Sequence, residues 1–216
     1  MQQSTQSAVA QIEFVVRTMA RTAIDNETYF GDLDAVVGDG DFGYSIARGF
    51  EAILAGIDGF DRSSGNTFLK KIALTITSKV GGTSGPLWGT AFLRAAGIAG
   101  EKTSLTWFDA VEMLKAAAGG IKQRGQSDVG DKTLLDALVP ATEALESELA
   151  ADPNAPGAQL LDRAADVADQ SAQNTKTMLA KRGRASYSGE RSIGTLDAGA
   201  VAIARILADL RDAVRA

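Results

Sequence analysis

The sequence contains 216 residues, of which 45% are hydrophobic and 23% charged, so the chain is long enough to bury one substantial core, with two small cores also possible. Its net charge of −5 argues against a nucleic-acid partner, and its lack of histidine and cysteine excludes histidine triads, thiol nucleophiles, disulfides and zinc fingers. No run approaches the ~20 apolar residues of a membrane span, and the N-terminus lacks a secretory pattern. We therefore expect a cytoplasmic protein without a membrane segment, folded as a single domain over residues 1–216.

Helical periodicity dominates the chain. Val9 and Ile12 share one helical face near the start, and Ile206 and Leu210 share one near the end. Residues 71–77 alternate like a strand, but the apolar residues on both sides extend the pattern to a length that favours a helix. The predicted helices span residues 4–24, 27–36, 41–58, 63–80, 85–99, 104–124, 131–150, 156–180 and 198–215.

The predicted helices have similar lengths and short connections, which favours an all-α, antiparallel up-and-down bundle. In such a bundle every second connection returns to the same end. Four connections of unusual composition, near residues 38–41, 81–84, 125–130 and 183–197, therefore meet at one rim. The connections near 59–62, 100–103 and 151–157 lie at the opposite end and are ordinary in composition.

The first rim connection gathers three carboxylates, those of Asp34, Asp39 and Asp41, within eight residues. Carboxylates that close need protonation or a cation, and Mg²⁺ takes oxygen ligands while leaving sites for phosphate oxygens. Residues 38–43 also fit a dinucleotide-binding fingerprint, but the aspartates would bring negative charge to the pyrophosphate. Helix capping explains one aspartate and not three. A metal-nucleotide site is therefore the first hypothesis.

The next two rim connections have both ordinary and functional interpretations. Residues 81–86 open a helix with Thr83 or Ser84 as its cap, and their glycines would also let backbone amides approach an anion. Residues 125–133 resemble a P-loop with Asp131 inserted, but a helix end precedes them where a Walker A loop needs a strand. We predict that Asp131 caps the following helix.

The last rim connection is too long for a simple link between helices, and loops of this length are usually functional or disordered. Arg184 or Arg191 could clamp a phosphate there, although most surface arginines have no specific role. Asp197 is predicted to cap the final helix.

Taken together, the motifs at 38–43, 81–90, 130–138 and 183–194 resemble, in the same order, those of the L subunit of dihydroxyacetone kinases. That subunit is the nucleotide-binding half of the enzyme. The resemblance extends from about residue 30 to about residue 200, and four long motifs in order are far more specific than any one of them.

The resemblance implies a barrel of eight long helices with the nucleotide at one rim. It also implies that Asp34, Asp39 and Asp41 hold two Mg²⁺ ions bridging the phosphates of ADP or ATP. The residues implied to surround the nucleotide are Phe42, Gly43, Tyr44, Ser45, Thr83, Ser84, Gly125, Leu134, Arg184, Asp197 and Gly199.

In the resembled family, a separate K subunit binds dihydroxyacetone covalently through a histidine. This chain has no histidine, so we expect it to need that partner. The phosphate donor is either ATP or a phosphotransferase-system protein that rephosphorylates bound ADP, and a homodimer is a further expectation. Two other hypotheses are a non-catalytic nucleotide-loaded module that signals to a transcription regulator, and a helical interaction bundle.

The chain departs from the family pattern at two places. Phe42 stands where the family usually has histidine, and residues 195–198 read Thr-Leu-Asp-Ala in place of His-Gln-Asp-Pro. The metal aspartates are present, so these departures bear on selectivity for nucleotide or substrate. The expected acceptor is dihydroxyacetone or a related keto-triose or tetrulose.

Overall fold

The structure, a computed structural model, describes residues 6–215, and within them it contains α-helices and short 3₁₀ helices but no strand. Among these residues no helix combines the length and the apolar character needed to cross a bilayer. The helices are α1 (Ala8–Asp25), α2 (Glu27–Ala35), α3 (Phe42–Gly56), η1 (Ile57–Gly59), α4 (Gly65–Lys79), α5 (Ser84–Ala99), α6 (Trp107–Gly125), α7 (Leu135–Ala151), α8 (Gly157–Asn174), η2 (Thr175–Thr177), η3 (Arg184–Ser192) and α9 (Ala198–Arg215).

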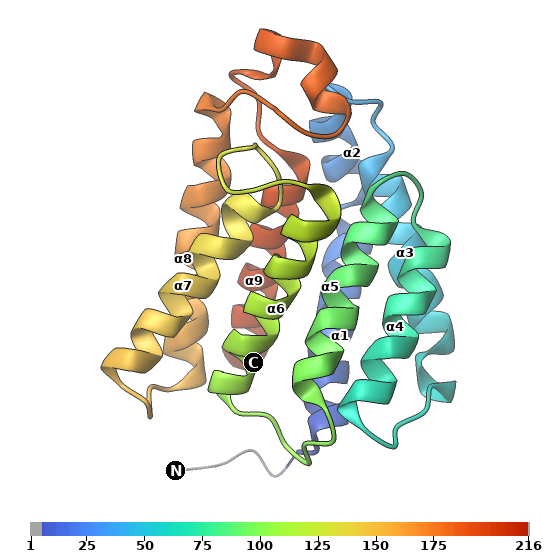
Figure 1. Ribbon diagram of the computed structural model, residues 1–216, viewed down its shortest axis with the longest axis vertical. Coiled ribbons are helices and arrows are strands. Elements are labelled where there is room, and N and C mark those ends of the chain that lie inside the picture. Colours follow the sequence, from blue (N-terminus) through green and yellow to red (C-terminus); the bar gives the residue numbers. More distant parts are fainter. Residues whose placement is uncertain (1–5, 216) are drawn as a thin grey trace.

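The long helices α1 and α3 to α9 run alternately up and down and form a closed ring (Figure 1). Each packs on the next in the order α1, α3, α4, α5, α6, α7, α8, α9, and α9 packs on α1 to complete the circle. The short helix α2 lies at one end against α3 and α9. The predicted all-α up-and-down barrel of about eight long helices is therefore confirmed.

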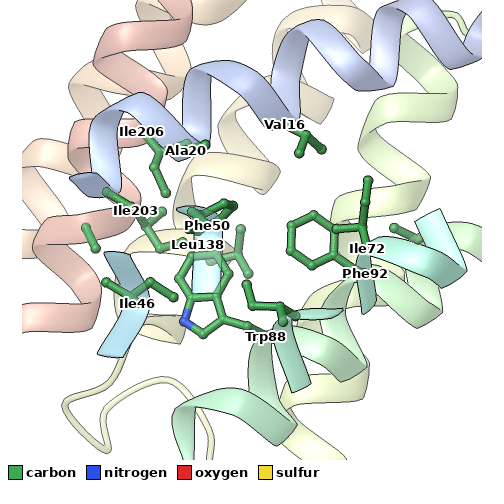
Figure 2. Packing of buried hydrophobic residues seen from close by; sticks show 14 of the residues in the cluster. Val16, Ala20, Ile46, Phe50, Ile72, Trp88, Phe92, Leu138, Ile203 and Ile206 are labelled. Carbon is green, nitrogen blue, oxygen red and sulfur yellow. The ribbon is translucent and has the colours of Figure 1, made fainter. Parts of the chain in front are cut away.

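Large side chains fill the inside of the ring (Figure 2). Phe50 of α3 meets Trp88 and Phe92 of α5 edge to face, with ring centroids 6.1 and 6.5 Å apart. Ile72 from α4 and Leu138 from α7 pack into the same cluster. Full burial of such a side chain contributes about 1.5–3 kcal/mol each. The interior is thus a packed core, which leaves the two ends of the barrel for chemistry.

Most predicted helices match the observed ones within a few residues. The segment 71–77, which alternates like a strand, lies within α4 with Ile72 and Ile76 buried one turn apart, so the helical interpretation is confirmed. Of the helix predicted over 4–24, residues 4 and 5 lie outside the described part of the chain.

Two predicted boundaries are wrong by several residues. The helix predicted over 131–150 begins at Leu135, because Gly130 and Lys132 take left-handed backbone conformations, with φ of +91° and +61°. The helix predicted over 156–180 ends at Asn174, where the Thr175 hydroxyl donates to the Ala172 carbonyl at 2.6 Å and a 3₁₀ turn follows.

The four unusual connections meet at one rim, as predicted (Figure 1). The Ser188 hydroxyl donates to the Val37 carbonyl at 3.0 Å, which joins the last connection to the first. The Lys181 amide donates to the Asp131 carbonyl at 3.1 Å, which joins it to the third. The second connection lies beside α3, since a Cβ on Gly81 would come 3.8 Å from the Ser45 hydroxyl.

Candidate functional site

Asp34, Asp39 and Asp41 converge at this rim. One carboxylate oxygen from each lies within 4.8 Å of the others. Asp34 lies in the last turn of α2, Asp41 immediately precedes α3, and Asp39 lies in the turn between the two helices. Asp39 and Asp41 are exposed and Asp34 is half-buried, so the cluster opens to solvent.

Glycines make the turn between α2 and α3 tight enough to bring these carboxylates together. A Cβ on Gly38 would lie 2.3 Å from Asp34 Oδ1, so a side chain there would displace that carboxylate. Gly40 has a φ of +77°, a conformation that glycine adopts without strain. A Cβ on Gly43 would lie 2.0 Å from the Glu27 carbonyl, so only glycine lets α3 pack this closely on α2.

Negative charge accumulates within the cluster. Desolvation raises the pKa of Asp41 above its ordinary value, the carboxylates of Asp39 and Asp34 raise it further, and Arg184 opposes them. Like charges held this close favour either a proton or a cation between them. Three carboxylate oxygens at this spacing, open on one side, suit a hard divalent cation that completes its shell with water or phosphate oxygens.

The connection between α8 and α9 lies over the cluster. Arg184 reaches Asp39 in an ion pair of 2.6 Å. Ser188 is anchored on Val37, as described above, and Tyr187 between them is 90% exposed. Arg191 is exposed and joins no ion pair among the described residues. Only one of the two candidate arginines thus faces the carboxylates.

Two of the helices that begin at this rim, α3 and α5, follow residues whose side chains do not cap them. Asp41 precedes α3 and Thr83 precedes α5, and neither side chain accepts a hydrogen bond from its helix. Free N–H groups and the positive end of the helix dipole favour an anion at such a terminus. Ser84 begins α5 and is not its cap, so the alternative of Ser84 as cap is wrong.

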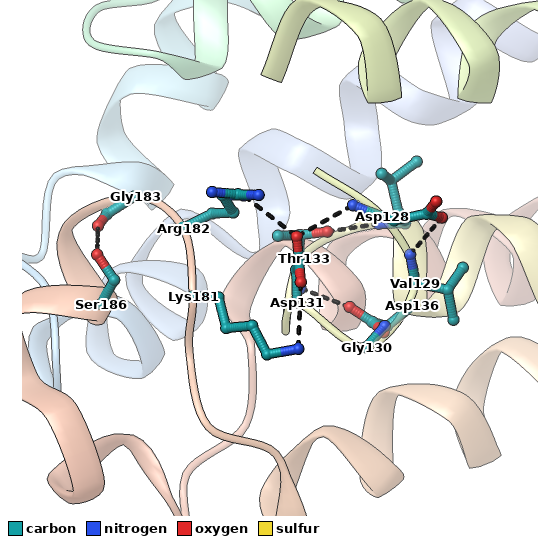
Figure 3. Close-up of polar contacts among 11 residues, drawn as sticks. Asp128, Val129, Gly130, Asp131, Thr133, Asp136, Lys181, Arg182, Gly183 and Ser186 are labelled. Carbon is teal, nitrogen blue, oxygen red and sulfur yellow. Dashed lines mark hydrogen bonds and ion pairs between the residues drawn. The ribbon is translucent and has the colours of Figure 1, made fainter. Parts of the chain in front are cut away.

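Asp131 does not cap a helix, which corrects the prediction (Figure 3). Its carboxylate is 3.3 Å from the Lys181 ammonium and 3.1 Å from Arg182 Nε, and these ion pairs, together with a hydrogen bond from the Asp128 amide, lower its pKa even though burial opposes the shift. The backbone amides of this connection are instead satisfied by Asp136, whose carboxylate accepts hydrogen bonds from the amides of Gly130 and Thr133 at 2.5 and 2.7 Å.

Residues 125–133, which resemble a P-loop, follow a helix and not the strand that a Walker A loop needs, as the sequence indicates. Helix α6 precedes them, and the Lys132 ammonium points inward to carbonyl groups. The dinucleotide-binding interpretation of residues 38–43 fails for a related reason, since this turn joins two helices and no strand precedes it within the described chain.

Asp197 lies where α9 begins, and its Oδ2 accepts a hydrogen bond from the Ala200 amide at 2.8 Å, so the predicted cap is confirmed. Burial raises the pKa of Asp197 to about 7, with Asp136 and Asp34 adding to the shift while the Ala200 hydrogen bond and Lys132 oppose it. Asp197 therefore belongs to the same electrostatic neighbourhood as the carboxylate cluster.

The structure brings the other predicted site residues to the same rim. Gly199 lies against Leu134, since a Cβ on Gly199 would be 3.2 Å from Leu134 Cβ, and Gly125 lies in the same way against Leu87 at the start of α5. Tyr44, Thr83 and Arg184 are exposed; Phe42, Ser45, Ser84, Gly125, Leu134, Asp197 and Gly199 are half-buried; and Gly43 is buried.

These features describe an all-helical protein that presents carboxylates and open helix N-termini at one rim, the combination expected of a metal-dependent phosphate-binding site. The chain belongs to the DAK2 domain family, which matches residues 36–212.

Named relatives agree with this assignment. The chain is 39% identical over 175 residues to the ADP-binding subunit DhaL of the PEP-dependent dihydroxyacetone kinase of Escherichia coli, covering 81% of this chain and 82% of that subunit. It is 36% identical to L-erythrulose 1-kinase of Mycolicibacterium smegmatis, covering 95% of this chain and 36% of that protein. The crystal structure of the C. freundii dihydroxyacetone kinase with AMP-PNP and Mg²⁺ superposes with a TM-score of 0.73 at 28% identity, covering 98% of this chain and 35% of that one.

Proposed function

We propose that this chain is the nucleotide-binding, phosphoryl-donor subunit of a dihydroxyacetone kinase. The observation that carries the proposal is the convergence of Asp34, Asp39 and Asp41 at the open rim, in a chain that resembles an ADP-binding subunit over most of its length. Residues 1–216 form one such domain in this proposal, located in the cytoplasm.

In this proposal the three aspartates hold Mg²⁺, two ions in all, against the phosphates of ADP or ATP. Bound Mg²⁺ would neutralise charge on the phosphate oxygens during transfer. The first-turn amides of α5, and those of α3 other than the Phe42 amide, which donates to Asp34 Oδ2, would bind phosphate oxygens, and Gly38 keeps the space that the carboxylates need. Arg184 is positioned beside the same phosphates, and the remaining predicted residues surround the nucleotide.

The acceptor must come from another protein. Covalent capture of a keto-sugar by histidine is not available to a chain without histidine, so a K subunit carrying the substrate docks over the rim. The name of the E. coli relative, a PEP-dependent kinase subunit, favours a phosphotransferase-system protein as the donor that recharges bound ADP. A homodimer is compatible with this arrangement, because the rim occupies only one end of the barrel.

The substrate is a short keto-sugar of three or four carbons. Dihydroxyacetone follows from the E. coli relative, and a tetrulose follows from the erythrulose kinase, to which the chain is nearly as similar. The departures at Phe42 and at residues 195–198 lie at the rim, where they can affect this choice.

Reconstitution tests the proposal. The chain is combined with the K subunit and offered dihydroxyacetone and the two erythrulose enantiomers, with either ATP or a phosphotransferase donor. We expect phosphorylation that requires both proteins and Mg²⁺. Retention of Mg²⁺-ADP without transfer to any sugar would instead identify the regulatory module. If the purified chain retained no nucleotide at all, the hypothesis of a helical interaction bundle would be the one that remains.

A further inference from the structure

Lys132 is a buried charge that the proposed chemistry does not use. Its side chain comes from the connection between α6 and α7, and the residue is 3% exposed. The ammonium donates to the carbonyls of Met178 at 3.3 Å and Thr195 at 2.8 Å, to the Ser192 carbonyl, and to the Thr195 hydroxyl at 3.1 Å. It joins no ion pair within residues 6–215, so backbone carbonyls are its main partners.

The backbone at Lys132 is also unusual. Its φ of +61° lies in the left-handed region, which non-glycine residues occupy at a cost in conformational energy. A glycine would relieve that strain but would leave the carbonyls without a donor. Burying an ammonium is itself unfavourable unless its protons are satisfied. Strain and a buried charge at one residue indicate that this amine has a specific task.

The acceptors of Lys132 lie at both ends of one segment. Met178 comes before the α8–α9 connection turns over the rim, and Ser192 and Thr195 come after it. The ammonium therefore closes the base of a loop whose tip carries the Arg184–Asp39 ion pair. Two further bonds cross the same base, from the Ala180 amide to the Ser192 hydroxyl and from the Gly194 amide to the Lys176 carbonyl.

We propose that Lys132 is a positioning residue whose ammonium gathers these carbonyls and thereby holds residues 178–195 over the carboxylate cluster, placing Arg184 beside the bound phosphates. The placement of the loop stands on its own contacts, whereas its effect on nucleotide binding rests on the proposed function. An ammonium suits this task because it offers three donors in different directions, which a neutral side chain of the same length lacks.

The absence of cysteine from the chain allows a direct test. In a Lys132→Cys variant, the single thiol is alkylated in denaturant and the protein is refolded. Bromoethylamine gives a thioether side chain that ends in an ammonium, and iodopropane gives one of the same length without charge. The two products differ at this one position only in the presence of the amine.

The first readout is chymotrypsin cleavage after the exposed Tyr187, which requires the loop to open and needs no ligand. The propyl form should be cut about ten-fold faster than wild type, because the loss of charge-assisted hydrogen bonds raises the open population. The aminoethyl form should return to within about two-fold of wild type. Equal cleavage of the two forms would overturn the proposal.

The second readout is Mg²⁺-ADP affinity by calorimetry, which should fall in the propyl form and recover in the aminoethyl form. If wild type binds no nucleotide, the proposed function fails while the cleavage test of the loop still decides the role of Lys132. If the propyl form does not refold, Thr195→Val removes one acceptor and should still speed cleavage, by a smaller factor. Lys70→Met, which removes an exposed lysine on the barrel wall, is the matched control and should change neither readout.

Discussion

The two ends of the barrel satisfy their helix termini in different ways. At the end opposite the rim, Ser7, Ser64 and Thr106 each accept a hydrogen bond from the first turn of α1, α4 and α6, and Thr106 forms a complete capping box with Asp109. At the rim, Asp197 caps α9, but the residues that immediately precede α3, α5 and α7 make no such side-chain bond to their helices. Side-chain caps therefore serve three of the four helices that begin at the opposite end, with α8 as the exception, and only α9 among the long helices that begin at the rim.

The charges show the same contrast. At the opposite end, Glu13 accepts from both Arg17 and Arg62, and these cations lower its pKa. At the rim, three carboxylates share one arginine, and the pKa of Asp41 is raised. A protein can thus keep its structural charges paired and concentrate uncompensated charge where a cation is to bind.

The largest expected effect comes from removing a cluster carboxylate. Asp39→Ala deletes one predicted metal ligand and should weaken Mg²⁺-ADP binding by about 100-fold. The thermal shift induced by Mg²⁺-ADP should shrink accordingly. Without nucleotide, the melting temperature should change little, because the substitution removes like-charge repulsion and also the ion pair with Arg184.

The matched control is Asp32→Ala, which removes an exposed carboxylate from α2, just before the turn that carries Asp39 and outside the cluster. It should leave the nucleotide-induced shift intact. If Asp39→Ala kept the full shift, the assignment of the metal site would be wrong.

A smaller effect, confined to partner docking, is expected from Arg191→Glu. Arg191 is exposed on the rim loop but does not reach the carboxylates, so reversing its charge should raise the K-subunit concentration for half-maximal activity by about ten-fold. Mg²⁺-ADP affinity should stay within about two-fold of wild type. Lys70→Glu, on the barrel wall, is the control. Equal losses of docking and of nucleotide affinity would identify Arg191 as a nucleotide ligand. No loss in either would show that Arg191 is an ordinary solvent-exposed side chain.

The next prediction concerns pH. The pKa of Asp197 rises from 3.8 to about 7 on folding, so between these values the folded state binds the extra proton. The free energy of unfolding without nucleotide should therefore fall as pH rises through this window. Asp197→Asn keeps an oxygen for the Ala200 amide but cannot titrate, so its stability should depend less steeply on pH. Urea unfolding at a series of pH values measures this, and parallel curves for the two proteins would contradict the prediction.

The smallest effect is expected at the opposite end. Thr106→Ala removes the capping box and should cost about 1 kcal/mol in the free energy of unfolding. Nucleotide affinity and activity should not change, because the site lies at the other end of the barrel. A change in affinity from this substitution would show that the two ends are energetically coupled.

The sequence was sufficient to predict the helices and their alternation, because periodicity and short connections are local properties. It also predicted which connections meet, since direction along an up-and-down bundle follows from counting. The Asp39–Arg184 pair lies beyond such reasoning, because residues about 145 apart in the chain meet through the closure of the ring.

The errors are equally physical. Asp131 has the position of a helix cap in the sequence, but its carboxylate forms ion pairs with Lys181 and Arg182, which come from a distant connection. Lys132 reads as part of a weak P-loop pattern, and its burial depends on carbonyls contributed by another loop. Its left-handed backbone conformation, two residues after Gly130, is a property of the folded chain that no periodicity in the sequence reveals.

The closure of the ring by α1 and α9 has a consequence for the order in which contacts form during folding. The first helix must wait for the last before the barrel can close, since these two helices are neighbours in space. Helix α2, which carries Asp34, also gains its contact with α9 only then. Contacts between distant parts of a chain form late because their loop-closure entropy must be overcome first. Because α2 packs on α3 as well as on α9, the helix that carries Asp34 gains the second of these two contacts only when the ring closes.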